Sequence, residues 1–239
     1  LRWFELNARG LDVAIDDVSE RTAAIALQGP LARDVLNAAT DSNWSGLGYY
    51  RRRAGRAGTI EIDVSRTGYT GDLGYELWVD AKQATALWDR LVEVGRPYAI
   101  RPAGMLALDM TRLEAGLILI EVDYTSATQA LVSTQNYSPF EIGLGRLVNL
   151  NKSTDFVGKR ALVAEQEAGG PKRRLVGLEI DWPSIEVNFE AQGLPIHVPL
   201  AAWREQVPVY AGSRQVGRAT SGTWSPTLRV HIARAQVDA

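Results

Sequence analysis

Runs of alternating apolar and polar residues predict strands in the first eighty residues of the chain. Residues 12–19, DVAIDDVS, alternate as a half-buried strand does, and residues 21–30, RTAAIALQGP, form a second apolar run that is ended by Gly29. Residues 57–65, AGTIEIDVS, and residues 74–80, GYELWVD, have the same character. We interpret all of these runs as strands.

Apolar residues at helical spacing predict helices between and after these strands. One helix is opened by Pro30, one spans 80–95 with Asp80 as its N-cap, one spans 102–116, and a short one lies within 156–170. The predicted apolar sides of the first two helices are Leu31, Val35 and Leu36, and Ala84, Leu87, Trp88, Leu91 and Val92. The pattern is typical of an α+β fold, with helices packed on a mostly antiparallel sheet.

The pattern changes at Gly169-Gly170-Pro171, where two glycines and a proline break any helix. Short β-rich runs separated by turn residues follow, and no helical period is evident there except around residues 200–205, LAAWRE. We therefore predict two domains, 1–170 and 171–239. The second is expected to be a small, incomplete all-β barrel, with a sandwich as the alternative.

Composition excludes several classes of site. The net charge is −2, so no basic field favours nucleic acid or an anionic membrane as a partner. The chain has no cysteine, which excludes disulfides, thiolate metal sites and cysteine nucleophiles, and its two histidines leave little scope for a histidine metal site. No apolar run reaches the ~20 residues of a membrane span. We expect a cytoplasmic protein without a metal.

The segment SRTGYTGDLGYELWVD, residues 65–80, contains the most distinctive candidate site. A hairpin turn centred on residues 72–73, flanked by glycines that permit positive φ, would place Tyr69 directly opposite Glu76. Strand alternation then puts Glu76 and Trp78 on one face. The apolar residues expected on the other face are Tyr75, Leu77 and Val79.

A carboxylate between aromatic side chains suits a flat heterocycle with adjacent N–H donors, because it accepts two parallel hydrogen bonds. The alternative is that Glu76 is an exposed strand residue, or that it pairs with a cation such as Arg66. The basic run at residues 49–56, YYRRRAGR, is interpreted as a solvated hairpin rim; a docking patch for an acidic partner is the alternative. Asp109 and Arg112 have the spacing of a local helical ion pair, and we expect a mainly structural role.

The motif SRTGYTGDLGYEL resembles the signature of the glycine-cleavage T-protein family of folate-dependent aminomethyltransferases. Further segments that resemble the family follow in its order: VSERTAAIALQGPLARDVL, ALDMTRLEAGLILIEVDYT, SPFEIGLGRLV, KSTDFVGKRAL and ATSGTWSPTLRVHIARAQVD. The resemblance extends through nearly the whole chain.

This resemblance implies a tetrahydrofolate site in which Glu76 binds the pterin and Tyr69 lines the folate cleft. The alternative to a structural role for Arg112 is that it reaches the folate cleft. The family transfers a one-carbon unit from a small amine, thioether or ether donor to tetrahydrofolate, and a lipoyl-carrier protein is a candidate partner. The family's catalytic aspartate belongs to an N-terminal part that has no counterpart here, so no catalytic residue is assigned. We expect the chain to be truncated at both ends and inactive as it stands.

One departure from the family pattern concerns the donor. Leu108 occupies a position where glycine-cleavage members carry an arginine, which places the glycine-cleavage donor in doubt but not folate binding. Two alternatives stay open. The first, kept open by the missing N-terminal part, is the folate module of a flavin-dependent dimethylglycine or sarcosine dehydrogenase. The second is a non-catalytic folate-binding relative, against which the absence of cysteine argues.

Overall fold

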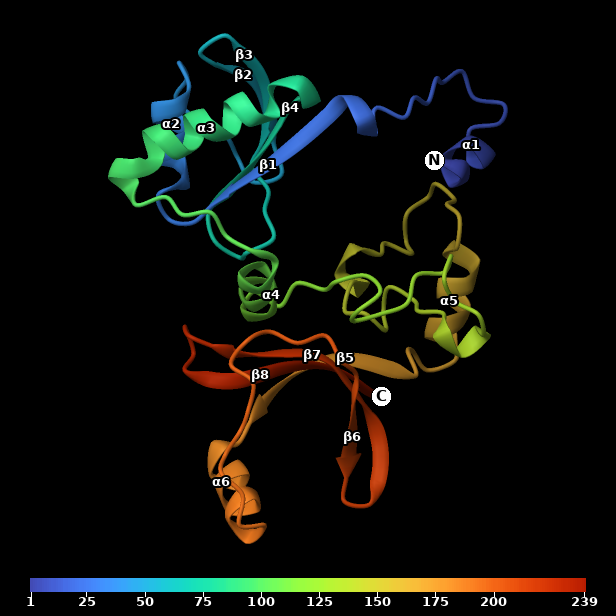
Figure 1. Ribbon diagram of the computed structural model, residues 1–239. Helices are drawn as coiled ribbons and strands as arrows, with labels where there is room; N and C mark the ends of the chain where they lie inside the picture. Colours follow the sequence, from blue (N-terminus) through green and yellow to red (C-terminus); the bar gives the residue numbers. More distant parts are fainter. The chain divides into compact units, whose positions relative to one another are not determined.

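A computed structural model describes all residues from 1 to 239 and divides them into two compact units, 1–102 and 103–239 (Figure 1). Each unit contains one antiparallel four-stranded sheet with its own helices. The predicted α+β class is confirmed, with a barrel-type sheet in the C-terminal part of the chain.

The sheet of the first unit has the order β1-β4-β3-β2. Its strands are β1 (Thr22–Gln28), β2 (Arg52–Ala57), β3 (Ile60–Ser65) and β4 (Gly74–Asp80). Strand β4 therefore lies in the middle of the sheet, with backbone hydrogen bonds to β1 on one side and to β3 on the other. Strand β2 is an edge strand whose arginine-rich side chains are largely exposed, in line with the predicted solvated rim.

Two helices, α2 (Ala32–Ala39) and α3 (Ala84–Gly95), pack against each other and against one face of this sheet (Figure 1). The buried core between them contains the apolar residues of β3 and β4, together with Leu36, Leu87 and the fully buried Trp44. The indole of Trp44 donates a hydrogen bond to Thr40 Oγ1 at 2.7 Å. The opposite face of the sheet is left without a covering helix of this unit.

The predicted strand at residues 12–19 is wrong, because the backbone there is irregular. The Asp17 carboxylate accepts a hydrogen bond from the Ser19 amide at 3.0 Å and so closes a local turn. That turn opens a short 3₁₀ helix.

The chain contains several short helices. The 3₁₀ helices are η1 (Ser19–Arg21), η2 (Ala81–Gln83), η3 (Arg96–Tyr98), η4 (Ser133–Gln135) and η5 (Gly145–Leu147), and a short α1 (Arg2–Asn7) precedes them all. Asp80 caps η2 rather than α3.

The second unit begins with helix α4 (Met105–Glu114), which packs on the sheet strands β7 and β8. Its other elements are α5 (Lys159–Glu167), β5 (Arg173–Ile180), α6 (Trp182–Ala191), β6 (Val207–Ala211), β7 (Arg214–Ser225) and β8 (Val230–Asp238). The sheet has the order β5-β8-β7-β6. The domain boundary predicted at residue 171 falls inside this unit, between α5 and β5, and stays a prediction.

Helix α6 was not predicted, although the sequence contains its start signal. Asp181 is its N-cap, with a carboxylate that accepts a hydrogen bond from the Ser184 amide at 3.0 Å, and Pro183 lies in its first turn. Only Ile185 and Phe189 of the helix are half-buried, so its apolar stripe is too narrow to stand out. The residues of LAAWRE do not form a helix; Trp203 instead pairs with Gly222 by a single β-bridge.

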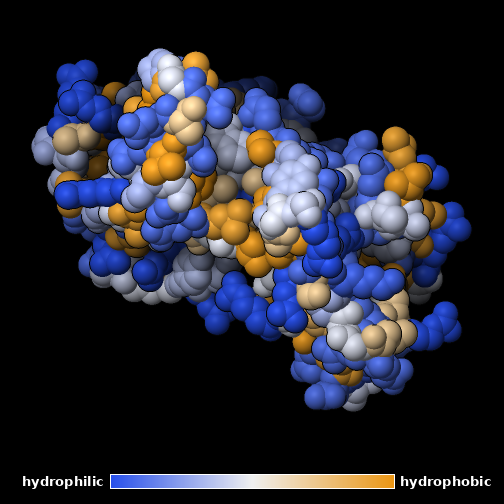
Figure 2. All heavy atoms as spheres, turned by 90° about the horizontal axis from the view of Figure 1, so that it is seen from below, coloured by the Kyte–Doolittle hydropathy of each residue, from blue (hydrophilic) through white to orange (hydrophobic).

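The surface is mixed in character. Charged and polar residues cover much of the face drawn in Figure 2, with smaller groups of apolar residues between them. None of the helices has both the length and the apolar character needed to cross a bilayer.

Candidate functional site

Strand β4 presents two chemically different faces, as its alternation predicts. Tyr75, Leu77 and Val79 point into the helix-covered core, where they are almost entirely buried. Glu76 and Trp78 point to the uncovered face of the sheet, where Glu76 is half-buried and Trp78 is 44% exposed. The predicted assignment of faces is therefore confirmed.

The predicted cross-strand partner of Glu76 is wrong. Glu76 lies opposite Ser65 of β3 and Ala26 of β1, not opposite Tyr69. Strand β3 ends at Ser65, and Tyr69 lies half-buried in the connecting loop, residues 66–73.

Burial of apolar residues sets this register. The observed pairing aligns Val64 with Leu77 and Ile62 with Val79, so both strands direct their apolar residues into the same core. Pairing centred on residues 72–73 would instead place a glycine opposite Leu77. The two registers differ by four residues, an even number, so each side chain keeps its face, but only the observed pairing sets the apolar residues of β3 beside those of β4. The larger apolar contact therefore decides the pairing.

The loop at 66–73 is organised around the side-chain amide of Gln28. Its Nε2 donates to Tyr75 O at 3.1 Å and to Thr67 O at 3.4 Å. A Cβ added at Gly68 or at Gly74 would lie 2.0 Å or 1.7 Å from Gln28 Oε1. These two glycines therefore make room for an amide. Only Gly71 of the motif adopts a positive φ, of 80°, so the predicted turn role applies to Gly71 and not to Gly74.

The Glu76 carboxylate is held by hydroxyl groups rather than by a cation. Thr67 Oγ1 donates a hydrogen bond to Oε2, and Ser65 Oγ lies 3.5 Å from the same oxygen. The Arg66 guanidinium instead donates to Leu47 O at 3.1 Å, so the ion pair considered as an alternative does not form. A carboxylate on an uncovered sheet face, with its hydroxyl partners on one oxygen, retains capacity to accept hydrogen bonds from a ligand.

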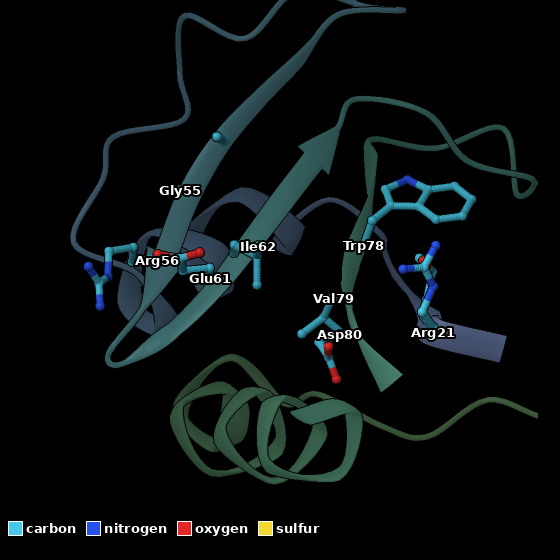
Figure 3. A pocket seen from close by; sticks show the side chains of 10 residues that line it. Arg21, Gly55, Arg56, Glu61, Ile62, Trp78, Val79 and Asp80 are labelled. Carbon is cyan, nitrogen blue, oxygen red and sulfur yellow. The ribbon is translucent and has the colours of Figure 1, made fainter. Parts of the chain in front are cut away.

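A groove of about 670 Å³ continues from Trp78 along the same sheet (Figure 3). Trp78 and Arg21 lie at one end, and the cross-strand partners Arg56 and Glu61 lie at the other. Asp80 also lines it, so cations and carboxylates are both present and no single charge dominates the groove.

The second unit contains a buried polar cluster to which helix α4 contributes Asp109 and Arg112. Asp123 accepts hydrogen bonds from Arg112 at 2.7 Å on Oδ2 and from the hydroxyls of Thr220 and Ser221 at 2.6 and 2.9 Å on Oδ1. Asp109 contacts Arg112 and also pairs with Arg204 at 2.7 Å. The charges in this cluster are paired with one another, which indicates a structural role.

The histidines form no catalytic arrangement. His231 is buried, stacks on Trp182 with ring centroids 5.6 Å apart, and meets Trp224 edge-on at 5.1 Å. Burial lowers the pKa of its imidazole. No group of three or more His, Cys, Asp or Glu side chains could hold a metal ion.

Sequence comparison places these features in a known family. Residues 1–152 match the GCVT N-terminal domain, and residues 173–239 match the glycine cleavage T-protein C-terminal barrel domain. The chain belongs to the glycine cleavage T-protein family. The two matched segments together leave out only residues 153–172, the segment that contains α5.

Two aminomethyltransferases of this family are similar in sequence to almost the whole of this chain. An aminomethyltransferase of Thermotoga neapolitana is 37% identical over 235 residues, which is 98% of this chain and 56% of that protein. An aminomethyltransferase of Moorella thermoacetica is 38% identical over 237 residues, or 99% of this chain and 57% of that protein. The chain thus spans about half the length of the curated relatives it matches.

A solved structure supports the fold. The crystal structure of glycine cleavage system aminomethyltransferase T from Bartonella henselae aligns with a TM-score of 0.74 at 24% identity. The alignment covers 99% of this chain and 56% of that one. This likeness supports the architecture described above.

Proposed function

We propose that this chain provides the pterin-binding part of a tetrahydrofolate-dependent one-carbon transferase, with Glu76 as the pterin anchor. The observation that carries the proposal is the Glu76 carboxylate, which faces away from the core and has its hydroxyl partners on one oxygen. The membership in a family of aminomethyltransferases supports the same assignment.

The residues present suit the amino-pyrimidinone edge of a pterin. That edge carries adjacent N–H donors, and an ionised carboxylate can only accept hydrogen bonds, so donors and acceptor match. The indole of Trp78, 44% exposed beside the carboxylate, adds an aromatic surface for a flat ring. Tyr69 lies in the loop that holds Thr67, and we assign it to the lining of the proposed pterin site.

Tetrahydrofolate, when bound, would accept the one-carbon unit on a ring nitrogen. The residues of this chain would bind and orient the tetrahydrofolate. Placing the acceptor nitrogen beside the donor is by itself a large contribution to the rate enhancement. We propose that the transferred group is an aminomethyl, methylene or methyl unit. We further propose a lipoyl-carrier protein as its source. No catalytic acid or base is assigned.

A second candidate is the folate module of a flavin-dependent dimethylglycine or sarcosine dehydrogenase. The feature that favours it is Leu108, half-buried on α4, where the family resemblance leads one to expect an arginine. A leucine offers no guanidinium to an anionic group. Transfer assays with dimethylglycine, sarcosine and an aminomethyl-lipoyl carrier as alternative donors distinguish the two candidates.

The decisive variant is Glu76→Gln in the full-length protein, because it keeps the size of the side chain and replaces one acceptor oxygen by a donor. A charge-assisted hydrogen bond contributes about 1.5–3 kcal/mol, so tetrahydrofolate should bind roughly 10- to 100-fold more weakly by calorimetry. Glu93→Gln, at an exposed position on α3, is the matched control and should bind normally. Wild-type affinity in Glu76→Gln would refute the anchor.

A further inference from the structure

Four side chains on the uncovered side of β3 and β4 form a continuous line of hydrogen bonds. The indole Nε1 of Trp78 donates to Ser65 Oγ at 3.3 Å, and Ser65 Oγ lies 2.9 Å from Thr67 Oγ1. Thr67 Oγ1 in turn donates to Glu76 Oε2. The line therefore runs from an exposed indole to the carboxylate of the proposed pterin anchor.

The chemistry of the two ends determines the direction of every proton in this line. An indole N–H can only donate, and an ionised carboxylate can only accept. The Thr67 hydroxyl uses its single proton on Glu76, so it must accept from Ser65. Ser65 Oγ has three possible acceptors, of which Thr67 Oγ1 at 2.9 Å is nearer than Glu76 O at 3.4 Å or Glu76 Oε2 at 3.5 Å. Ser65 therefore donates its proton to Thr67 and accepts from Trp78. All three hydrogen bonds thus point toward Glu76, an arrangement in which each bond polarises and strengthens the next.

The backbone holds this line in place. Ser65 is the last residue of β3 and lies directly opposite Glu76, while Trp78 lies two residues further along β4 on the same face. Thr67 belongs to the loop, and its carbonyl accepts a hydrogen bond from Gln28 Nε2 at 3.4 Å. The hydroxyl groups are therefore placed by the sheet and by the Gln28 amide before any ligand arrives.

We propose that Thr67, Ser65 and Trp78 are positioning residues for folate binding, which hold Glu76 Oε2 and thereby present Oε1 to the N–H groups of the ligand. This inference rests on the proposed function of Glu76. Because the line ends on an acceptor, the site selects a ring whose facing edge carries N–H donors. A ring that presents an acceptor there meets a carboxylate that cannot donate.

The first test removes the hydroxyl closest to Glu76. Thr67→Val keeps the shape of the side chain, and we expect tetrahydrofolate affinity of the full-length protein, measured by calorimetry, to fall about 5- to 10-fold. Thr67→Ser restores the hydroxyl and should bind within about twofold of wild type, as should the control Thr59→Val in the β2–β3 turn. Equal weakening in Thr67→Val and Thr67→Ser would overturn the proposal.

The second test removes the first donor of the line. Trp78→Phe keeps an aromatic ring but no N–H, and we expect a loss of affinity of about threefold. Trp88→Phe on α3 is its control, because Trp88 is also 44% exposed. Trp78→Phe involves no change in the loop, so it tests the proposal even if Thr67→Val fails to fold. Unchanged affinity in Trp78→Phe would remove the indole from the line.

A double-mutant cycle shows whether Thr67 acts through Glu76. In the Glu76→Gln background, Thr67→Val should have at most about a twofold further effect, since the charged acceptor is gone. An undiminished 5- to 10-fold effect there would mean that Thr67 acts on the ligand or fold directly, against the proposal. If Glu76→Gln weakens binding but Thr67→Val does not, the positioning line fails while the proposed function survives; if Glu76→Gln binds normally, the anchor itself fails.

Discussion

Arg112 Nη1 lies 2.7 Å from Asp123 Oδ2, and both side chains are completely buried in the second unit. Arg112 also contacts Asp109 at 3.3 Å, so the helical ion pair predicted from its spacing exists. On a solvated helix surface a pair at this spacing contributes only about 0.2–0.5 kcal/mol. In the interior, removal of one partner leaves an uncompensated charge, which is far more costly.

We therefore predict that Arg112→Ala lowers the free energy of unfolding by about 3–5 kcal/mol, measured by urea denaturation. Arg174→Ala, at an exposed position on β5, should change it by less than about 0.5 kcal/mol. Tetrahydrofolate binding is the second readout. A tenfold loss of affinity in Arg112→Ala with unchanged unfolding would assign Arg112 to the folate cleft instead.

A side chain at Gly74 should displace the Gln28 amide from its hydrogen bonds. A Cβ there would lie 1.7 Å from Gln28 Oε1, and the Gln28 amide holds the loop that carries Thr67. We expect Gly74→Ala to lower the melting temperature substantially and to weaken tetrahydrofolate binding, whereas Gly177→Ala, a strand glycine with open space around it, should do neither.

The rescue experiment for this glycine uses Gln28. Combining Gly74→Ala with Gln28→Ala removes the clash but also the amide bridge, so the melting temperature should recover in part and folate affinity should not. If Gly74→Ala alone melts and binds tetrahydrofolate like wild type, the Gln28 amide does not hold this loop.

Stability should fall on acidification because of His231. Burial lowers the pKa of this imidazole in the folded protein, whereas the unfolded chain titrates at about 6.5. The unfolded state therefore binds more protons below that pH, and the free energy of unfolding decreases as the pH falls from about 7 toward the folded-state pKa. Below both the unfolded-state and the folded-state pKa of His231, its protonation causes no further decrease in the free energy of unfolding.

His231→Phe removes the titrating group and retains a ring that can stack on Trp182. Its free energy of unfolding, measured between about pH 7.5 and pH 5, should decline less than that of wild type. His197→Asn, at an exposed position, is the matched control for the loss of a histidine. An identical pH dependence in His231→Phe and wild type would contradict the assignment of the acid sensitivity to His231.

Limited proteolysis tests the predicted domain boundary. Gly169 and Gly170 both adopt positive φ at the end of α5, and a Cβ added at either position would meet no atom within 4 Å. We expect a non-specific protease such as proteinase K to cleave first near residues 169–172. First cleavage near residues 100–104, between the two compact units, would instead show that the structural division governs accessibility.

Which residues of β4 face the core and which face outward follows from the sequence alone, because strand alternation is a local property. Glu76 and Trp78 were correctly placed on one face for that reason. Local periodicity likewise predicted α2, α3 and α4. The family relationship could also be inferred from long motifs, which need no structure to be compared.

The surroundings of those residues depend on the packed fold and could not be predicted from local patterns. The register of β3 against β4 depends on two apolar faces that share one core, so the turn glycines alone predicted it wrongly. Gln28 lies 39 residues before Thr67, and Thr220 lies 97 residues after Asp123, yet each pair is joined by a hydrogen bond. Such partners have no fixed sequence spacing, because they meet only after the chain has packed its core and brought distant polar groups together.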